Sequence, residues 1–130
     1  MMPRLFCALL TAAVLALAQV PASQADVSAT TEREIQYLLE FVANSGCSFE
    51  RNGSVHDPED AADHLRLKYR RGGRYVDTTE HFIDRLASES SWTGKKYTVT
   101  CEGQVIPSGQ WLHQALNDYR AQDKESAPSR

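Results

Sequence analysis

Apolar residues recur at the three- and four-residue spacing of an amphipathic helix in four segments of this chain. Polar residues flank each apolar face, which is the pattern of a helix that packs one side on a core. In chain order the faces are Ile35, Leu38, Leu39 and Val42; Ala61, Ala62, Leu65 and Tyr69; Phe82, Ile83, Leu86 and Ala87; and Trp111, Leu112, Ala115, Leu116 and Tyr119. We therefore predict four helices.

Capping signals set the predicted start of each helix. Thr31 and Glu34 form a T-x-x-E capping box, so the first helix is predicted from about Glu32 to Ser45, before Gly46.

Asp57-Pro58 starts the second helix, which is predicted to end before Gly72-Gly73. Asp77 is the predicted cap of the third helix, whose end is placed in the serine-rich segment 88–91. Pro107-Ser108 leads into the fourth.

Two short segments have the composition of strands. Cys47–Arg51 is followed by Asn52-Gly53, a strong hairpin signal, and Val55-His56 is a candidate returning arm. Tyr97–Cys101 is β-branched and aromatic, which favours a strand. We expect Cys47–Arg51 and Tyr97–Cys101 to be paired neighbours. The predicted fold is one small α+β domain, with about four helices packed on a short two- or three-stranded antiparallel sheet.

Composition narrows the class of protein without naming a function. The chain has 130 residues, 14 Lys and Arg against 17 Asp and Glu, and a formal net charge of −3. This length excludes a multi-domain enzyme or a (β/α)₈ barrel. The mild acidity argues against a dedicated nucleic-acid binder, which is usually basic.

The first 25 residues have the pattern of a secretory signal peptide. Arg4 supplies the positive charge, Leu5–Leu17 is apolar, and Ser23-Gln24-Ala25 suits cleavage after Ala25. The apolar run is shorter than the roughly 20 residues that span a bilayer as a helix. We predict a periplasmic chain with no membrane span after cleavage, a single domain over residues 26–120, and a disordered polar tail over 121–130.

Two cysteines remain after the predicted cleavage, Cys47 and Cys101. An even pair in an exported protein indicates a disulfide. The alternative is a reactive cysteine beside a histidine.

The candidate chemistry is concentrated in a polar segment after the first predicted strand. Asp60, His64, Lys68 and Arg71 lie along one side of the second helix. The predicted ligand-binding residues are Arg51, Asn52, His56, His64, Lys68, Arg70, Arg71 and Arg74. Such a pocket would suit an anionic or sugar-like group.

Two structural interpretations compete with a ligand pocket. In the first, Arg51 pairs with Asp60 or Asp63 and His64 forms a hydrogen bond in a half-buried site. In the second, the basic run from Arg66 to Arg74 only complements the dipole at the end of a solvated helix.

A metal site would use His56, Asp57, Asp60 and His64, which lie close together in the sequence. The cations of the second helix would repel the ion, and there is no H-E-x-x-H motif. We therefore predict no metal and no cofactor. Trp92 and Trp111 are assigned to the core or its edge.

The segment F-x-R-N-G-x-x-H, followed by A-A-x-H-L-x-x-K, resembles the YfeK-like family of small exported bacterial proteins. The matching residues are Phe49, Arg51, Asn52, Gly53, His56, Ala61, Ala62, His64, Leu65 and Lys68. Further similarity runs from about Glu34 to Tyr119. The resemblance implies a periplasmic location and carries no established activity.

No catalytic motif accompanies these residues, since the chain lacks a G-x-S-x-G nucleophile elbow. We predict a non-enzymatic binding domain for an anionic envelope ligand or a protein partner. The alternative is a small hydrolase of an envelope polymer, which would use His64 or His56 with a nearby carboxylate.

Overall fold

The computed structural model describes residues 13, 15, 16 and 22–127, with only the backbone for residues 22–28. Most of the predicted signal peptide lies outside the described residues. The elements are α1 (Ala22–Ala43), β1 (Ser48–Arg51), β2 (Ser54–His56), α2 (Pro58–Gly72), the 3₁₀ turn η1 (Gly73–Tyr75), α3 (Thr79–His81), the π-helical η2 (Phe82–Ala87), β3 (Thr98–Cys101), β4 (Gln104–Pro107) and α4 (Ser108–Ser126).

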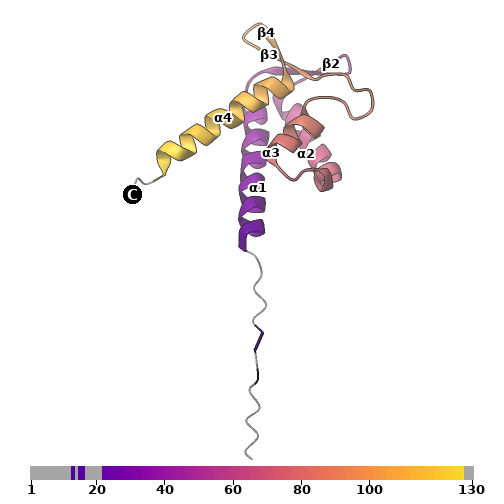
Figure 1. Ribbon diagram of the computed structural model, residues 1–130. Coiled ribbons are helices and arrows are strands. Elements are labelled where there is room, and N and C mark those ends of the chain that lie inside the picture. The colour runs from indigo at the N-terminus through magenta and orange to yellow at the C-terminus, as the bar shows by residue number, and fades with distance from the viewer. Residues whose placement is uncertain (1–12, 14, 17–21, 128–130) are drawn as a thin grey trace, which may run out of the picture.

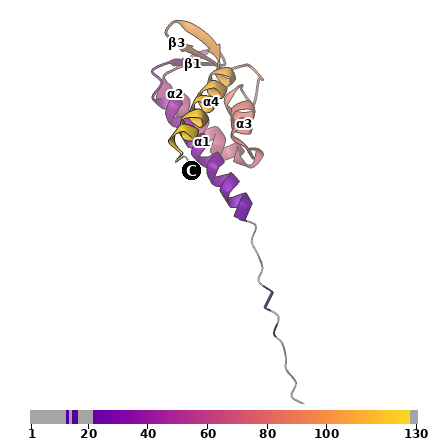
Figure 2. The same ribbon diagram turned by 60° about the vertical axis from the view of Figure 1, so that its left-hand side comes forward.

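The strands form one antiparallel sheet at one end of the helices (Figures 1 and 2). The strand order is β2-β1-β3-β4. β1 pairs with β3 with Phe49 opposite Val99, which confirms the predicted pairing of these two segments. The α+β class is confirmed, but the sheet has four strands rather than the two or three expected.

β4 was missed because its turn has a weak sequence signal. Both hairpin turns place two consecutive residues at positive φ: Asn52 and Gly53 at 50° and 82°, and Glu102 and Gly103 at 50° and 79°. This backbone is typical of two-residue hairpins, and Asn-Gly is the pair that adopts it most readily. Glutamate seldom does, so Glu102-Gly103 gave no turn prediction.

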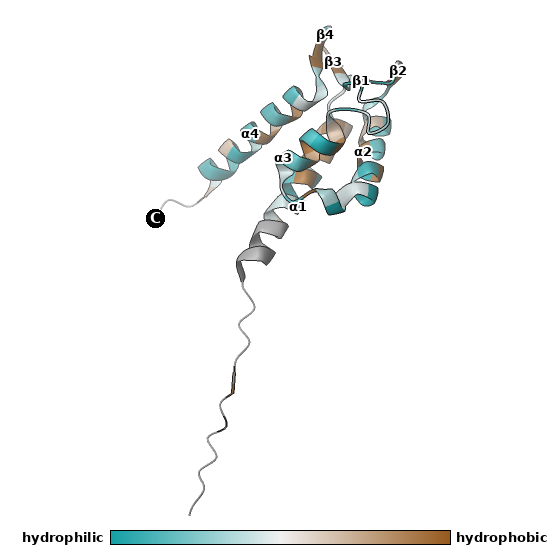
Figure 3. Cartoon of the chain, turned by 45° about the vertical axis from the view of Figure 1, so that its right-hand side comes forward, coloured by the Kyte–Doolittle hydropathy of each residue, from teal (hydrophilic) through white to brown (hydrophobic). Residues whose placement is uncertain are grey.

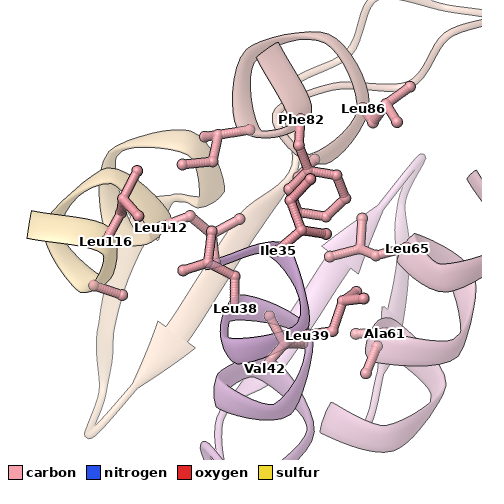
Figure 4. Close-up of a cluster of buried hydrophobic side chains, with 14 of the residues drawn as sticks. Ile35, Leu38, Leu39, Val42, Ala61, Leu65, Phe82, Leu86, Leu112 and Leu116 are labelled. Carbon is pink, nitrogen blue, oxygen red and sulfur yellow. The ribbon is translucent and has the colours of Figure 1, made fainter. Parts of the chain in front are cut away.

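The core lies where α1, α2, η2 and α4 meet beneath the sheet (Figures 3 and 4). All four predicted apolar faces contribute to it. Phe49 of β1 and Val99 of β3 close it from the sheet side. The members with relative exposures below 2% are Ile35, Leu38, Leu39, Val42, Ala62, Phe82, Ile83, Ala87, Val99, Leu112 and Leu116.

The first helix begins ten residues earlier than predicted. α1 starts at Ala22, so Thr31 lies within the helix and is not its cap. No glycine or proline stands between Ala22 and Thr31, and nothing in that segment ends a helix. The predicted cleavage site after Ala25 therefore falls in the first turns of α1.

The third helix is capped by Thr78 and not by Asp77. The Thr78 hydroxyl accepts a hydrogen bond from the amide N–H of His81 at 3.1 Å, as an N-cap does. The helix then continues as the π-helical η2. At its end the Ser88 hydroxyl donates to the Ile83 carbonyl at 2.6 Å, in the serine-rich segment where the helix was predicted to end.

The fourth helix extends beyond its predicted end. α4 continues to Ser126, so residues 121–126 of the predicted disordered tail are helical. Between Gly109 and Pro128 the sequence has no helix breaker. Figure 1 shows the C-terminal half of α4 leaning away from the rest of the domain.

The predicted disulfide is confirmed: Cys47, just before β1, is bonded to Cys101 at the end of β3, with their Cα atoms 4.8 Å apart. It joins the two central strands of the sheet. Among the described helices, none combines the length and the apolar composition that crossing a membrane requires.

Candidate functional site

A surface cleft of about 370 Å³ lies between α2 and the segment that connects η2 to β3. The lining residues come from the end of β1 and its turn to β2, from α2, from η1 and from residues 86–97. They are Arg51, Asn52, His64, Leu67, Lys68, Arg71, Gly72, Tyr75, Leu86, Ser90, Ser91, Trp92 and Tyr97. The cleft therefore brings together five of the predicted ligand-binding residues.

Asn52 connects the β1–β2 turn by hydrogen bonds to the segment between η2 and β3. Its side-chain amide donates to the hydroxyl of Ser90 at 3.3 Å. Its side-chain carbonyl accepts from the hydroxyl of Thr93 at 2.8 Å. These contacts link residues about 40 positions apart in sequence, so Asn52 has a structural role in shaping the site.

Lys68 is the most constrained cation in the cleft. Its Nζ donates to the carbonyl oxygen of Glu89 at 2.9 Å and to the hydroxyl of Tyr97 at 3.1 Å. Burial, together with the positive charge of Arg51, lowers the pKa of Lys68 to about 8, although the Glu89 carboxylate opposes this shift. Two hydrogen bonds therefore hold the Lys68 amine in place, and its surroundings favour the protonated form less than water does.

His64 lies on the same face of α2, one turn earlier. Its Nε2 is 3.5 Å from the Tyr97 hydroxyl, which is a long contact. Burial, together with the charges of Arg51, Lys68 and His56, lowers the pKa of His64 to about 4. The imidazole is therefore neutral at pH 7.

Tyr97 stands at the centre of this arrangement, next to both Lys68 and His64. The tyrosine is only 7% exposed, and burial raises the pKa of its hydroxyl. It therefore keeps its proton at neutral pH and offers a neutral hydroxyl between a cation and an imidazole. Sequence reasoning assigned Tyr97 to a strand and not to the site.

Glu89 and Asp63, which are sequence neighbours of the lining residues Ser90 and His64, are paired with cations that do not line the cleft. Glu89 binds Lys96 at 2.7 Å, and Asp63 binds Arg66 at 2.9 Å. The predicted pairing of Arg51 with Asp60 or Asp63 is wrong, since Arg51 forms no salt bridge among the described residues.

The structure separates the remaining predicted residues from the cleft. His56 lines a neighbouring hollow of about 30 Å³, together with Glu50 and His64. Arg70, near the end of α2, and Arg74, in η1, do not line the cleft. The Arg74 guanidinium lies 4.8 Å from the centre of the Tyr75 ring instead.

Trp92 was wrongly assigned to the core or its edge. It is 97% exposed and lies at the rim of the cleft. The burial of a tryptophan depends on where its turn is placed, and only the fold decides that.

Within the part of the chain that the structure describes, no three His, Cys, Asp or Glu side chains are grouped to hold a metal ion. His56, Asp57, Asp60 and His64 therefore do not converge on one point.

Comparison with known proteins places this chain in a family. Residues 29–120 match DUF5329, a family of unknown function. The uncharacterised protein YfeK of Salmonella typhimurium is 43% identical over 86 residues, which cover 65% of this chain and 72% of that protein. No solved structure matches the chain. The chain thus belongs to the YfeK-like DUF5329 family, whose function is unknown.

Proposed function

We propose that the cleft beside α2 binds an anionic group, so that the protein acts as a binding domain. One observation carries this proposal: Arg51, Lys68 and Arg71 line the cleft, and no lining residue is a carboxylate. Three cations in a concave surface raise the local concentration of an anion. A bound anion would also relieve the repulsion between Arg51 and Lys68.

The ligand is proposed to be an envelope component. Disulfides persist in oxidising compartments, so the Cys47–Cys101 bond supports a location outside the cytoplasm. The predicted signal peptide points the same way. An acidic protein surface is the alternative occupant.

The hydrolase alternative has less support. It needs His64 or His56 beside a carboxylate, and Glu50 meets both histidines only in the hollow of about 30 Å³. That volume has room for about one water molecule and not for a polymer segment.

Replacing cations inside the cleft should weaken anion binding, whereas replacing cations outside it should not. We expect Lys68→Met and Arg71→Gln each to lower the affinity for sulfate about tenfold, because each removes a charge-assisted hydrogen bond. Calorimetric titration with sulfate at constant ionic strength measures the change.

Arg70→Gln is the matched control, since it removes the same charge from α2 at a residue that does not line the cleft. Equal losses in all three variants would show that only the overall charge matters. Wild-type protein that binds no sulfate would contradict the proposal. Thermal unfolding of each variant verifies that it is folded.

Sulfate binding should also weaken as the pH rises through about 8. Lys68 loses its proton in this range, and a neutral amine attracts an anion less strongly. Sulfate stays a dianion, the arginines remain charged, and His64 is already neutral, so Lys68 dominates the change. Lys68→Met should abolish this pH dependence. An unchanged pH profile in that variant would assign the titration to another group.

A further inference from the structure

Trp92 presents nearly its whole indole to solvent at the edge of the cationic cleft. Its side chain is 97% exposed, whereas Trp111, the other tryptophan of the chain, packs against Phe49 and Phe41. An exposed aromatic ring beside a cleft is typical of a surface that contacts a ligand or partner.

The turn that carries Trp92 is held by hydrogen bonds. The Ser90 hydroxyl accepts from the backbone N–H groups of Trp92 and Thr93, both at 3.3 Å. The N–H of Gly94 donates to the Ser90 carbonyl at 2.9 Å. Ser90 is only 4% exposed, and its hydroxyl also accepts a hydrogen bond from the Asn52 side chain. The turn is therefore preorganised, so that a ligand would not have to order it.

A second exposed aromatic ring borders the same cleft. Tyr75, just after α2, is 55% exposed and lines the cleft. The cleft thus combines two exposed rings with three cations, as well as the hydroxyl groups of Ser91 and Tyr97. The faces of aromatic rings carry negative potential and attract the polarised C–H groups of a sugar ring.

We infer that the anion is the acidic group of a saccharide, with its carboxylate on Lys68, Arg51 and Arg71 and a sugar ring against Trp92. This inference rests on the proposed function. It identifies the anionic ligand of the cleft as a glycan that contains uronic acids. A cleft of about 370 Å³ is within the size range of small-ligand sites. It therefore suits one or two sugar rings, while the rest of a chain would remain in solvent.

Two probes with the same number of carboxylates separate a saccharide site from a general anion site. The first is tetragalacturonate, and the second is the peptide tetraglutamate with an acetylated N-terminus and an amidated C-terminus, so that each probe carries four carboxylates. Calorimetric titration of the folded protein at constant ionic strength gives each affinity. We expect the wild type to prefer tetragalacturonate by about tenfold, the value of one good aromatic contact.

Trp92→Ala should remove this preference by weakening tetragalacturonate binding about tenfold, with the affinities for tetraglutamate and sulfate unchanged. Trp92→Phe, which keeps a ring, should retain most of it. Val105→Ala is the matched control, because Val105 is 66% exposed and does not line the cleft. Tetragalacturonate should also protect Trp92 from fluorescence quenching by acrylamide, an uncharged quencher.

The outcomes distinguish the two proposals. Equal affinities for both probes, unaltered by Trp92→Ala, would overturn the saccharide inference and leave the anion site standing. A preference for tetraglutamate would overturn it in favour of an acidic protein partner. If neither probe nor sulfate bound, the proposed function itself would fail.

Discussion

Reduction of the Cys47–Cys101 disulfide will lower the free energy of unfolding by on the order of 4 kcal/mol. The bond joins residues 54 positions apart, and closing a loop of that length removes much conformational entropy from the unfolded chain. Domains of this size have a free energy of unfolding of only about 5–15 kcal/mol, so the disulfide contributes a large part of the total. The melting temperature should fall by roughly 15–20 °C on adding a reductant.

Thermal unfolding with and without reductant measures this effect. The double variant Cys47→Ser/Cys101→Ser is the control. It should melt at the temperature of the reduced wild type, and its melting temperature should not change when the reductant is added. A wild type whose melting temperature stays the same after reduction would show that the sheet holds β1 and β3 without the bond. Titration of the unfolded, unreduced protein should detect no free thiol at Cys47 or Cys101.

Removing Arg120 should cost about 2 to 3 kcal/mol of stability, because its guanidinium neutralises a carboxylate in the domain interior. Arg120 donates to both oxygens of Glu34, at 2.7 and 2.9 Å, and to Glu80 at 2.6 Å. Glu34 is only 6% exposed, and the Arg120 bonds hold its pKa below the usual value. Arg120→Met would leave the Thr79 hydroxyl as the partner of that buried carboxylate. A buried charge without a counter-charge lowers the free energy of unfolding.

The matched control is Arg66→Met, which breaks the exposed pairs with Glu40 and Asp63 and should cost less than about 1 kcal/mol. Adding Glu34→Gln to Arg120→Met should recover part of the loss, since the unpaired charge is gone. Urea unfolding of the four proteins measures the differences. Equal costs for Arg66→Met and Arg120→Met would mean that the Glu34 site is effectively solvated.

Glu34 shows why such a residue could not be predicted correctly from local patterns. Its spacing from Thr31 matches a capping box, which would place Glu34 in the first turn of the first helix. In the fold, Glu34 faces α4 and pairs with a residue 86 positions away. A capping box is a local signal, whereas an ion pair between distant helices depends on how those helices pack.

Local patterns were enough to predict the helix faces, the pairing of the two central strands and the disulfide. Periodicity reports which side of a helix is buried, because that side must be apolar wherever the helix packs. The same i, i+4 geometry correctly placed His64, Lys68 and Arg71 on one face. The resemblance to a known family also came from local motifs.

The surroundings of that face of α2 come from contacts between distant parts of the chain. The contact of Lys68 with Tyr97, the bridge from Asn52 to Ser90 and the position of Trp92 at the rim all join segments distant in the chain. The sequence could therefore show which charges α2 carries. Whether a carboxylate or an open cleft faces those charges depends on long-range packing, which local spacing does not encode.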